Sequence, residues 1–134
     1  MRPFLTPLKV ISTEKGVVRH ALKAHEESFT KFGEAYFSEV DYNAVKGWKL
    51  HTRMQMNLII PFGSVKFCVR SKQNDWSKVF QIGVENYCRL TVPPEYWLAF
   101  KGMNAGTNIV LNISDIEHDP NEVIQAPLHT YEFE

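Results

Sequence analysis

Short segments in which apolar and polar residues alternate constrain the fold of this chain more than any other feature. In G-S-V-K-F-C-V-R, Val65, Phe67 and Val69 would share one face of a strand, with Lys66 and Arg70 on the other. Similar segments are E-A-Y-F-S-E-V, V-K-G-W-K-L-H, K-V-F-Q-I-G-V, Y-C-R-L-T-V-P, W-L-A-F-K and T-N-I-V-L-N-I. Turn-forming residues separate many of them at intervals of about 8–12 residues, a spacing that predicts an all-β sandwich or barrel.

The length and composition indicate one globular domain that spans residues 1–134. The chain has 134 residues, of which 44% are hydrophobic and 22% charged. Only residues 20–31 have a helical composition, and they are too short to define a helical domain. The polar tail from Ser114 to Glu134 is expected to wrap around the outside of the domain or to pack on a partner subunit.

Charge, hydropathy and cysteine usage exclude several classes of partner. The 15 basic and 15 acidic residues balance, which argues against a nucleic-acid partner. No apolar run approaches the ~20 residues that span a bilayer, and the N-terminal stretch does not resemble a signal peptide. Cys68 and Cys88 lie in apolar runs, as expected for buried free thiols. We therefore expect a cytoplasmic protein without a membrane partner.

The segment V-K-G-W-K-L-H, residues 45–51, raises the main functional question. In a strand, Trp48 and Leu50 would point to one side, and Gly47, Lys49 and His51 to the other. This polar face is either the solvated outside of a sheet or the lining of a pocket, and the segment alone does not decide between them.

The order of strands and turns predicts a cupin, which is a double-stranded β-helix or jelly roll. A strand with a histidine is followed by a strand–turn–strand unit through Gly63, and then by a Pro93–Pro94 turn and a closing strand. Cupins often bind a metal ion, but the usual ligand positions hold Lys49, His51 and Leu98. A single potential ligand does not satisfy a metal ion, which normally needs three or four. We therefore expect neither a metal nor another cofactor, which disfavours a metal-dependent oxygenase.

A more specific resemblance rests on five segments that occur in family order and cover most of residues 32–122. They are F-G-E-A-Y-F-S-E-V, V-K-G-W-K-L-H, N-L-I-I-P-F-G-S-V-K-F, E-N-Y-C-R-L-T-V-P-P-E-Y-W-L-A-F-K-G and L-N-I-S-D-I-E-H-D-P-N-E. The chain resembles the small dTDP-4-dehydrorhamnose 3,5-epimerase-like cupins and the related dTDP-sugar 3,4-ketoisomerases. The resemblance implies a cytoplasmic protein of cell-surface carbohydrate biosynthesis, such as that of lipopolysaccharide. It also implies a nucleotide-sugar ligand and a homodimer that exchanges N-terminal strands within residues 1–40.

The family motifs assign roles to particular positions. The epimerases carry their catalytic base in R-G-x-H, and here Lys49 stands at the histidine. The ketoisomerases carry R-G-x-H-x-H, and the second histidine, their favoured base, is present as His51. The late-strand tyrosine that serves as acid in the epimerases corresponds to Leu111, and a helper lysine corresponds to Asn57. The epimerase constellation is therefore broken, whereas the ketoisomerase base is retained.

The resulting candidates are a catalytic set and a substrate-binding set. His51 is the candidate base, Lys49 its electrostatic partner or a replacement base, and Tyr36 a possible acid, although a tyrosine packed in the core is an equal alternative. The candidate substrate-binding residues are Glu34, Lys46, Arg53, Asn57, Asn112 and Trp97. Asn57 and Asn112 interrupt apolar strands, so we expect both amides to point inward.

Two functions remain open at this stage. The first is a cofactor-independent epimerase or ketoisomerase that removes a proton beside the ketone of a dTDP-4-keto-6-deoxy sugar and returns it elsewhere. The second is a non-catalytic cupin that binds a sugar nucleotide or a protein partner, favoured by the missing first histidine and late tyrosine.

Overall fold

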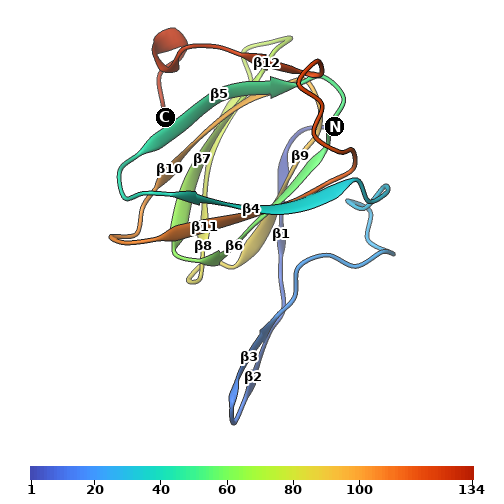
Figure 1. The fold of residues 1–134 in the computed structure, drawn as a ribbon, viewed down its shortest axis with the longest axis vertical. Coiled ribbons are helices and arrows are strands. Elements are labelled where there is room, and N and C mark those ends of the chain that lie inside the picture. The colour runs from blue at the N-terminus through green and yellow to red at the C-terminus, as the bar shows by residue number, and fades with distance from the viewer.

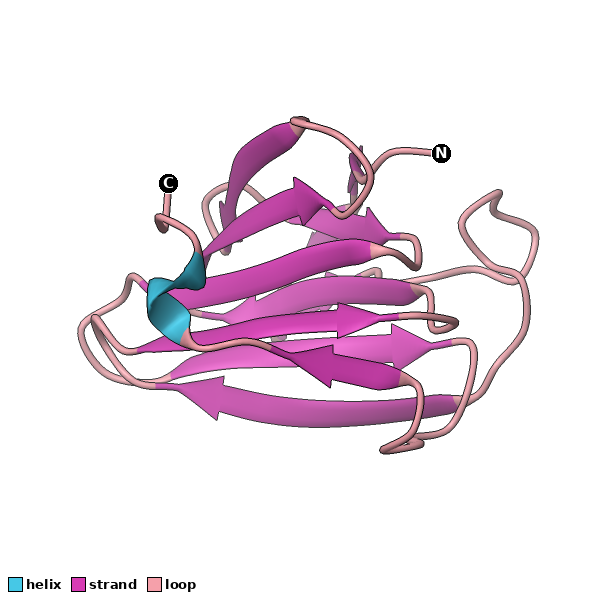
Figure 2. Cartoon of the chain, turned by 90° about the horizontal axis from the view of Figure 1, so that it is seen from above, coloured by secondary structure: helices cyan, strands magenta, loops and turns pink.

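The computed structural model describes all residues, 1–134, and its regular structure consists almost entirely of strands. The twelve strands are β1 (Phe4–Pro7), β2 (Val10–Thr13), β3 (Gly16–Arg19), β4 (Glu34–Val40), β5 (Val45–His51), β6 (Met56–Phe62), β7 (Ser64–Ser71), β8 (Ser77–Gly83), β9 (Cys88–Val92), β10 (Tyr96–Gly102), β11 (Asn108–Ser114) and β12 (Val123–Gln125). The one helical element is a short 3-10 turn, η1 (Leu128–Thr130), near the C-terminal end (Figure 2). Residues 20–31 form turns and no helix.

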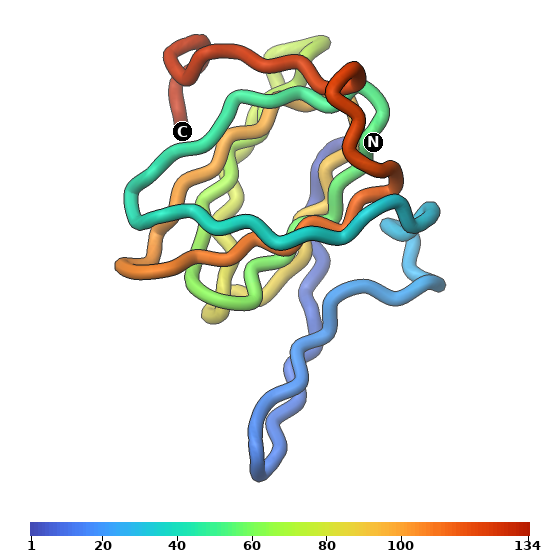
Figure 3. The backbone as a smooth tube through the Cα atoms, viewed as in Figure 1, coloured from blue at the N-terminus to red at the C-terminus, as the bar shows by residue number.

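The strands form two five-stranded antiparallel sheets and a separate hairpin (Figure 1). The first sheet has the order β1-β9-β6-β11-β4, and the second has the order β12-β5-β10-β7-β8. The predicted all-β jelly roll is confirmed. The hairpin β2–β3 projects away from the two sheets, as the backbone tube in Figure 3 shows. No helix is long and apolar enough to cross a membrane.

The core lies between the two sheets and follows the alternation of the sequence. Val65, Phe67 and Val69 of β7 are fully buried, as their spacing predicts. They pack with Leu90 and Val92 of β9, which come from the other sheet. Burial of such side chains contributes about 1.5–3 kcal/mol each, so the alternating strands supply the main stabilisation of the fold.

The outer face of β5 is covered by the C-terminal tail. β12 pairs with β5, and Ile124 lies opposite Leu50. Trp48 is 1% exposed, its indole Nε1 donates a hydrogen bond to the Leu128 carbonyl at 3.1 Å, and Tyr131 meets its ring edge-on at 5.4 Å between centroids. Because the tail shields this face, β5 buries apolar side chains on its outside and directs polar ones toward the interior.

The loop formed by residues 20–33 is held on the first sheet by a buried arginine. Arg89 of β9 is 1% exposed. Its guanidinium donates to the Ala21 carbonyl at 2.6 Å, to Glu26 Oε2 at 2.8 Å and to Ser28 Oγ at 2.8 Å. Polar contacts to the sheet therefore fix this loop in a non-helical conformation, which its local composition does not specify.

Candidate active site

A cavity of about 220 Å³ opens between the two sheets. Five of the nine predicted site residues line it: Tyr36, Lys46, Lys49, His51 and Asn112. The polar face of β5 is therefore the wall of a pocket and not the outside of a sheet. A larger and shallower depression of about 690 Å³ lies over turns at another part of the surface, and Glu85 is its one charged lining residue.

His51 forms a hydrogen-bonded pair with Glu122, a residue that the sequence analysis did not single out. Nδ1 of His51 contacts Oε1 of Glu122, which is 2% exposed. The other carboxylate oxygen accepts hydrogen bonds from the backbone N–H groups of Arg53 at 3.1 Å and Met54 at 3.3 Å. Glu122 thereby fixes the orientation of the imidazole and leaves Nε2 free of the carboxylate.

The environment of Glu122 keeps its carboxyl group ionised. Burial alone works to raise the pKa of Glu122. The hydrogen bond from His51 and those from the backbone of Arg53 and Met54 outweigh this effect, so the pKa is lowered from its ordinary value of 4.5. An ionised carboxylate at Nδ1 stabilises the imidazolium that forms when His51 accepts a proton, which is the arrangement of an oriented general base.

A hydrogen-bonded pair from two neighbouring strands forms another wall of the cavity. Tyr36 of β4 lies opposite Asn112 of β11, and Asn112 Nδ2 donates to the Tyr36 hydroxyl at 3.1 Å. Asn112 is 2% exposed, and its Oδ1 is buried without a hydrogen-bond partner. A buried amide oxygen without a partner costs about 1–3 kcal/mol, so this atom is a strong candidate to accept a hydrogen bond from a ligand.

The charged residues of the cavity wall are basic. Lys46 Nζ donates to the Glu39 carbonyl at 2.5 Å, whereas Lys49 makes no hydrogen bond or ion pair within the chain. No aspartate or glutamate is among the lining residues. The cavity therefore favours an anionic ligand, or a reaction in which negative charge develops on a ligand atom.

The other four predicted site residues lie outside the cavity lining. Asn57 was expected to point inward, and this is wrong: its amide donates to the Ser28 carbonyl at 3.0 Å and accepts from Thr91 Oγ1 at 2.7 Å. Its neighbour in the strand, Met56, lines the cavity, so alternation turns Asn57 to the opposite face. Trp97 packs on the outer side of the second sheet, where its ring lies 5.9 Å from that of Tyr131.

Arg53 and Glu34 fix a loop at the edge of the cavity. This loop, residues 115–122, joins β11 to β12. The Arg53 guanidinium pairs with Asp119 at 2.9 Å, and Glu34 Oε1 accepts a hydrogen bond from the backbone N–H of His118 at 2.9 Å. The side chain of His118 also lines the cavity.

The structure brings together no group of three or more His, Cys, Asp or Glu side chains with metal-site geometry. Lys49 and Leu98 occupy the positions of two usual cupin ligands, and both line the cavity. A metal ion normally needs three or four protein ligands, so the residues present do not fit a metal site.

Comparisons with known proteins place this chain in a family. No family model and no curated protein matches the sequence. Among solved structures, a dTDP sugar isomerase from Desulfovibrio desulfuricans is 30% identical, with a TM-score of 0.92, and the alignment covers 96% of this chain and 85% of that one.

Two more distant structures share the fold. The sugar 3,4-ketoisomerase QdtA from Thermoanaerobacterium thermosaccharolyticum, in complex with TDP, is 19% identical with a TM-score of 0.78, covering 93% of this chain and 88% of that one. A dTDP-4-dehydrorhamnose 3,5-epimerase from Sulfolobus tokodaii is 15% identical with a TM-score of 0.86, covering 98% and 80%. Together with the cavity on β5, the first match shows that this chain belongs to the RmlC-like cupin family of dTDP-sugar isomerases and epimerases.

Proposed function

We propose that this protein is a cofactor-independent isomerase or epimerase that acts on a dTDP-4-keto-6-deoxy sugar. The observation that carries the proposal is the His51–Glu122 pair at the wall of a cavity that has no acidic lining residue. The 30% identity to a dTDP sugar isomerase supports the substrate class. The family resemblance points to a role in the biosynthesis of a cell-surface carbohydrate.

In this proposal His51 removes the proton from the carbon next to the ketone. The electrons of the C–H bond move to the ketone oxygen and give an enolate, while Glu122 stabilises the resulting imidazolium. The ammonium group of Lys49 stabilises the negative charge on the enolate oxygen. His51 then returns the proton to a carbon atom of the sugar, which completes an isomerisation or an epimerisation without a cofactor.

Tyr36 and Asn112 would bind the sugar on another wall of the cavity. The Tyr36 hydroxyl accepts the amide hydrogen of Asn112, so its own O–H is free to donate to a sugar oxygen, as a hydrogen-bond donor or as an acid. The unpartnered Oδ1 of Asn112 would accept a hydrogen bond from a sugar hydroxyl. These two contacts would orient the ring relative to His51.

The size of the cavity suggests how the ligand is divided. Pockets for drug-sized ligands measure about 300–1,000 Å³, and this cavity, at about 220 Å³, is smaller. We therefore place the sugar inside the cavity and the nucleotide at its mouth. Lys46 is exposed at the wall and is suited to a diphosphate.

The rival function is a cupin that binds a sugar nucleotide without transforming it. Lys49 at the first histidine position favours this alternative. The two residues of β11 that line the cavity, Val110 and Asn112, also provide no acid of the epimerase type. The paired His51 and Glu122 favour catalysis, because a binding protein has no need of a buried carboxylate that orients an imidazole.

Solvent-deuterium exchange separates the two functions. We expect the wild-type protein in D₂O to introduce deuterium into dTDP-4-keto-6-deoxyglucose next to the ketone, observed by NMR or mass spectrometry. Binding of this compound without exchange would support the binding protein instead. If calorimetry detects no binding of any keto sugar nucleotide, both functions are wrong.

The exposed hairpin β2–β3 supports a homodimer, and the two free cysteines support a location in the cytoplasm. All eight residues of its strands except Arg19 are exposed, including Val10, Ile11, Val17 and Val18. An isolated two-stranded hairpin is marginally stable in water, so a second copy of the chain is the expected cover for these apolar residues. The free thiols Cys68 and Cys88 fit a reducing compartment.

We expect sedimentation to give a dimer of the 15.5 kDa chain, and the variant Ile11→Asp/Val18→Asp to dissociate it. The variant Thr13→Asp, which adds one negative charge near the tip of the same hairpin and removes no large apolar side chain, serves as the control. A wild-type protein that sediments as a monomer at all concentrations would contradict the dimer.

A further inference from the structure

We propose that His118 is a second catalytic residue, which carries the hydroxyl proton between two neighbouring oxygens of the sugar while His51 carries the carbon-bound proton. This inference rests on the proposed function and narrows it. The substrate would be a nucleotide sugar whose ketone lies next to a hydroxyl-bearing carbon, and the reaction would exchange these two groups.

The backbone of the 115–122 loop holds His118 in place. Its N–H is bound by Glu34 of β4, and the next residue, Asp119, pairs with Arg53 just beyond β5. Asp119 also accepts the backbone N–H of Asn121 at 2.9 Å. These contacts bind the loop to both sheets. Glu122 is the last residue of the same loop, so one loop would position both the partner of His51 and a second imidazole.

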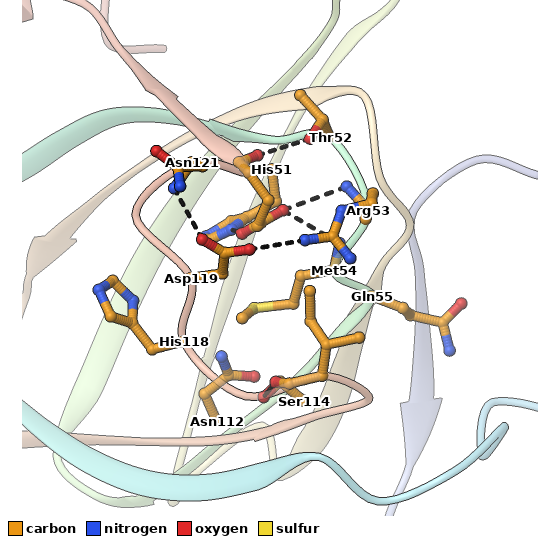
Figure 4. A network of polar contacts seen from close by, with 12 residues as sticks. His51, Thr52, Arg53, Met54, Gln55, Asn112, Ser114, His118, Asp119 and Asn121 are labelled. Carbon is orange, nitrogen blue, oxygen red and sulfur yellow. Dashed lines mark hydrogen bonds and ion pairs between the residues drawn. The ribbon is translucent and has the colours of Figure 1, made fainter.

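The imidazole of His118 is free for a ligand. It lines the cavity, it is exposed, and it makes no hydrogen bond or ion pair within the chain. In Figure 4 the ring extends away from Arg53 and lies apart from the Asp119–Arg53 pair. His51 and His118 therefore approach the same cavity from different elements, β5 and the 115–122 loop.

A ketone–hydroxyl exchange moves two protons, one between carbons and one between oxygens, and the two histidines account for both. His51 takes the proton from the hydroxyl-bearing carbon, the C–H electrons form a carbon–carbon double bond, and the former ketone oxygen takes a proton from the His118 imidazolium. The resulting enediol then loses its other hydroxyl proton to the neutral His118. The carbon–carbon double bond takes the proton held by His51, and the new ketone forms with both histidines restored to their starting states.

Histidine suits this role better than the other groups of the cavity wall. The carrier must first give a proton and then accept one within the same cycle. Ammonium and phenol groups ordinarily release their protons only well above neutral pH, whereas an imidazole exchanges its proton near pH 7. Lys49 and Tyr36 are accordingly left with charge stabilisation and hydrogen bonding.

The charged and titratable groups around His118 come from three elements. They are Glu34 and Tyr36 from β4, Lys46, Lys49 and His51 from β5, and Asp119 from its own loop. Because an imidazole would carry the proton between the two oxygens, the rate should depend on pH.

The test compares His118→Asn with His25→Asn, a matched change at an exposed loop residue outside the cavity lining. With dTDP-4-keto-6-deoxyglucose, we expect His118→Asn to lower kcat for ketone–hydroxyl exchange about 100-fold or more, with a smaller change in KM. Deuterium exchange at the carbon should fall less, since His51 remains. The high-pH fall in kcat of the wild type should disappear, because that fall reports the acid.

Added imidazole gives a second readout that a purely structural role would not move. Since His118 is exposed, imidazole in solution should restore part of the activity of His118→Ala. A wild-type kcat and pH profile in His118→Asn would overturn the proposal. Loss of ketone–hydroxyl exchange in Tyr36→Phe but not in His118→Asn would also overturn it and would assign the proton to Tyr36. A wild-type protein without activity would refute the proposed function itself.

Discussion

Replacing His51 with asparagine is expected to lower turnover and solvent-deuterium incorporation by about 10²–10⁴-fold, the usual contribution of a general base. Asparagine keeps a side-chain donor that can reach Glu122, so the loop that carries this carboxylate should stay in place. We therefore expect the free energy of unfolding and the Kd for the sugar nucleotide to change little. The measurement is a steady-state assay together with deuterium incorporation at the carbon next to the ketone.

A companion variant, Glu122→Gln, tests why His51 is effective. The amide cannot stabilise an imidazolium by charge, so kcat should fall at least tenfold while His51 itself is unchanged. The matched control for His51→Asn is His129→Asn, which changes a histidine of the 3-10 turn outside the cavity lining. If His51→Asn retains wild-type deuterium exchange while His118→Asn or Lys49→Met loses it, His51 is not the base.

Replacing Glu26 with alanine is expected to lower the free energy of unfolding by about 3 kcal/mol, because it leaves the charge of Arg89 buried and unpaired. Arg89 is 1% exposed, and Glu26 supplies its carboxylate partner at 2.8 Å. Removing both charges, as in Glu26→Ala/Arg89→Met, should restore much of this loss, since no buried charge remains. Urea unfolding of the single and double variants gives the coupling energy.

The same ion pair predicts a pH dependence. The hydrogen bond from Arg89 lowers the pKa of Glu26 below its ordinary value of 4.5. The folded state therefore gains stability from the ionised carboxylate above about pH 4.5, and this gain is lost as the pH falls through the lower pKa of the folded state. The double variant should lack this part of the acid destabilisation.

An exposed ion pair provides the control for both measurements. Lys72 and Glu95 lie 3.4 Å apart with side chains 46% and 37% exposed, so Lys72→Met should cost at most about 1 kcal/mol. An equal loss in Lys72→Met and Glu26→Ala would contradict a special contribution from the buried arginine.

Local alternation predicted the strands well, because the apolar residues of each strand lie on the side that faces an apolar layer. The bounds of β4 and β5 coincide with the segments E-A-Y-F-S-E-V and V-K-G-W-K-L-H. In β5, alternation correctly grouped Lys49 with His51 and separated them from Trp48. It did not reveal which group faces the interior, since the tail buries the apolar side on the outside.

Asn57 shows where such inference fails. Its strand, β6, is buried on both faces over Met56–Ile60, because the loop of residues 20–33 covers the outer face. Because its neighbours in the strand are apolar on both sides, the sequence pattern does not indicate which face of the sheet the Asn57 amide lies on. Ser28 and Thr91, which satisfy Asn57, are 29 and 34 residues away in the sequence.

The sequence by itself indicated most strands of the two sheets and grouped Lys49 with His51 on one face of β5, because these features depend on short-range alternation and turns. The succession of these strands and turns along the chain, together with the family resemblance, indicated the cupin architecture. The tertiary structure alone decided the partner of His51, which is 71 residues away, and the entry of His118 into the cavity. Both depend on where the 115–122 loop closes over the two sheets. The position of this loop depends on contacts with β4, with residues just after β5 and within the loop itself, so it cannot be predicted from any single segment.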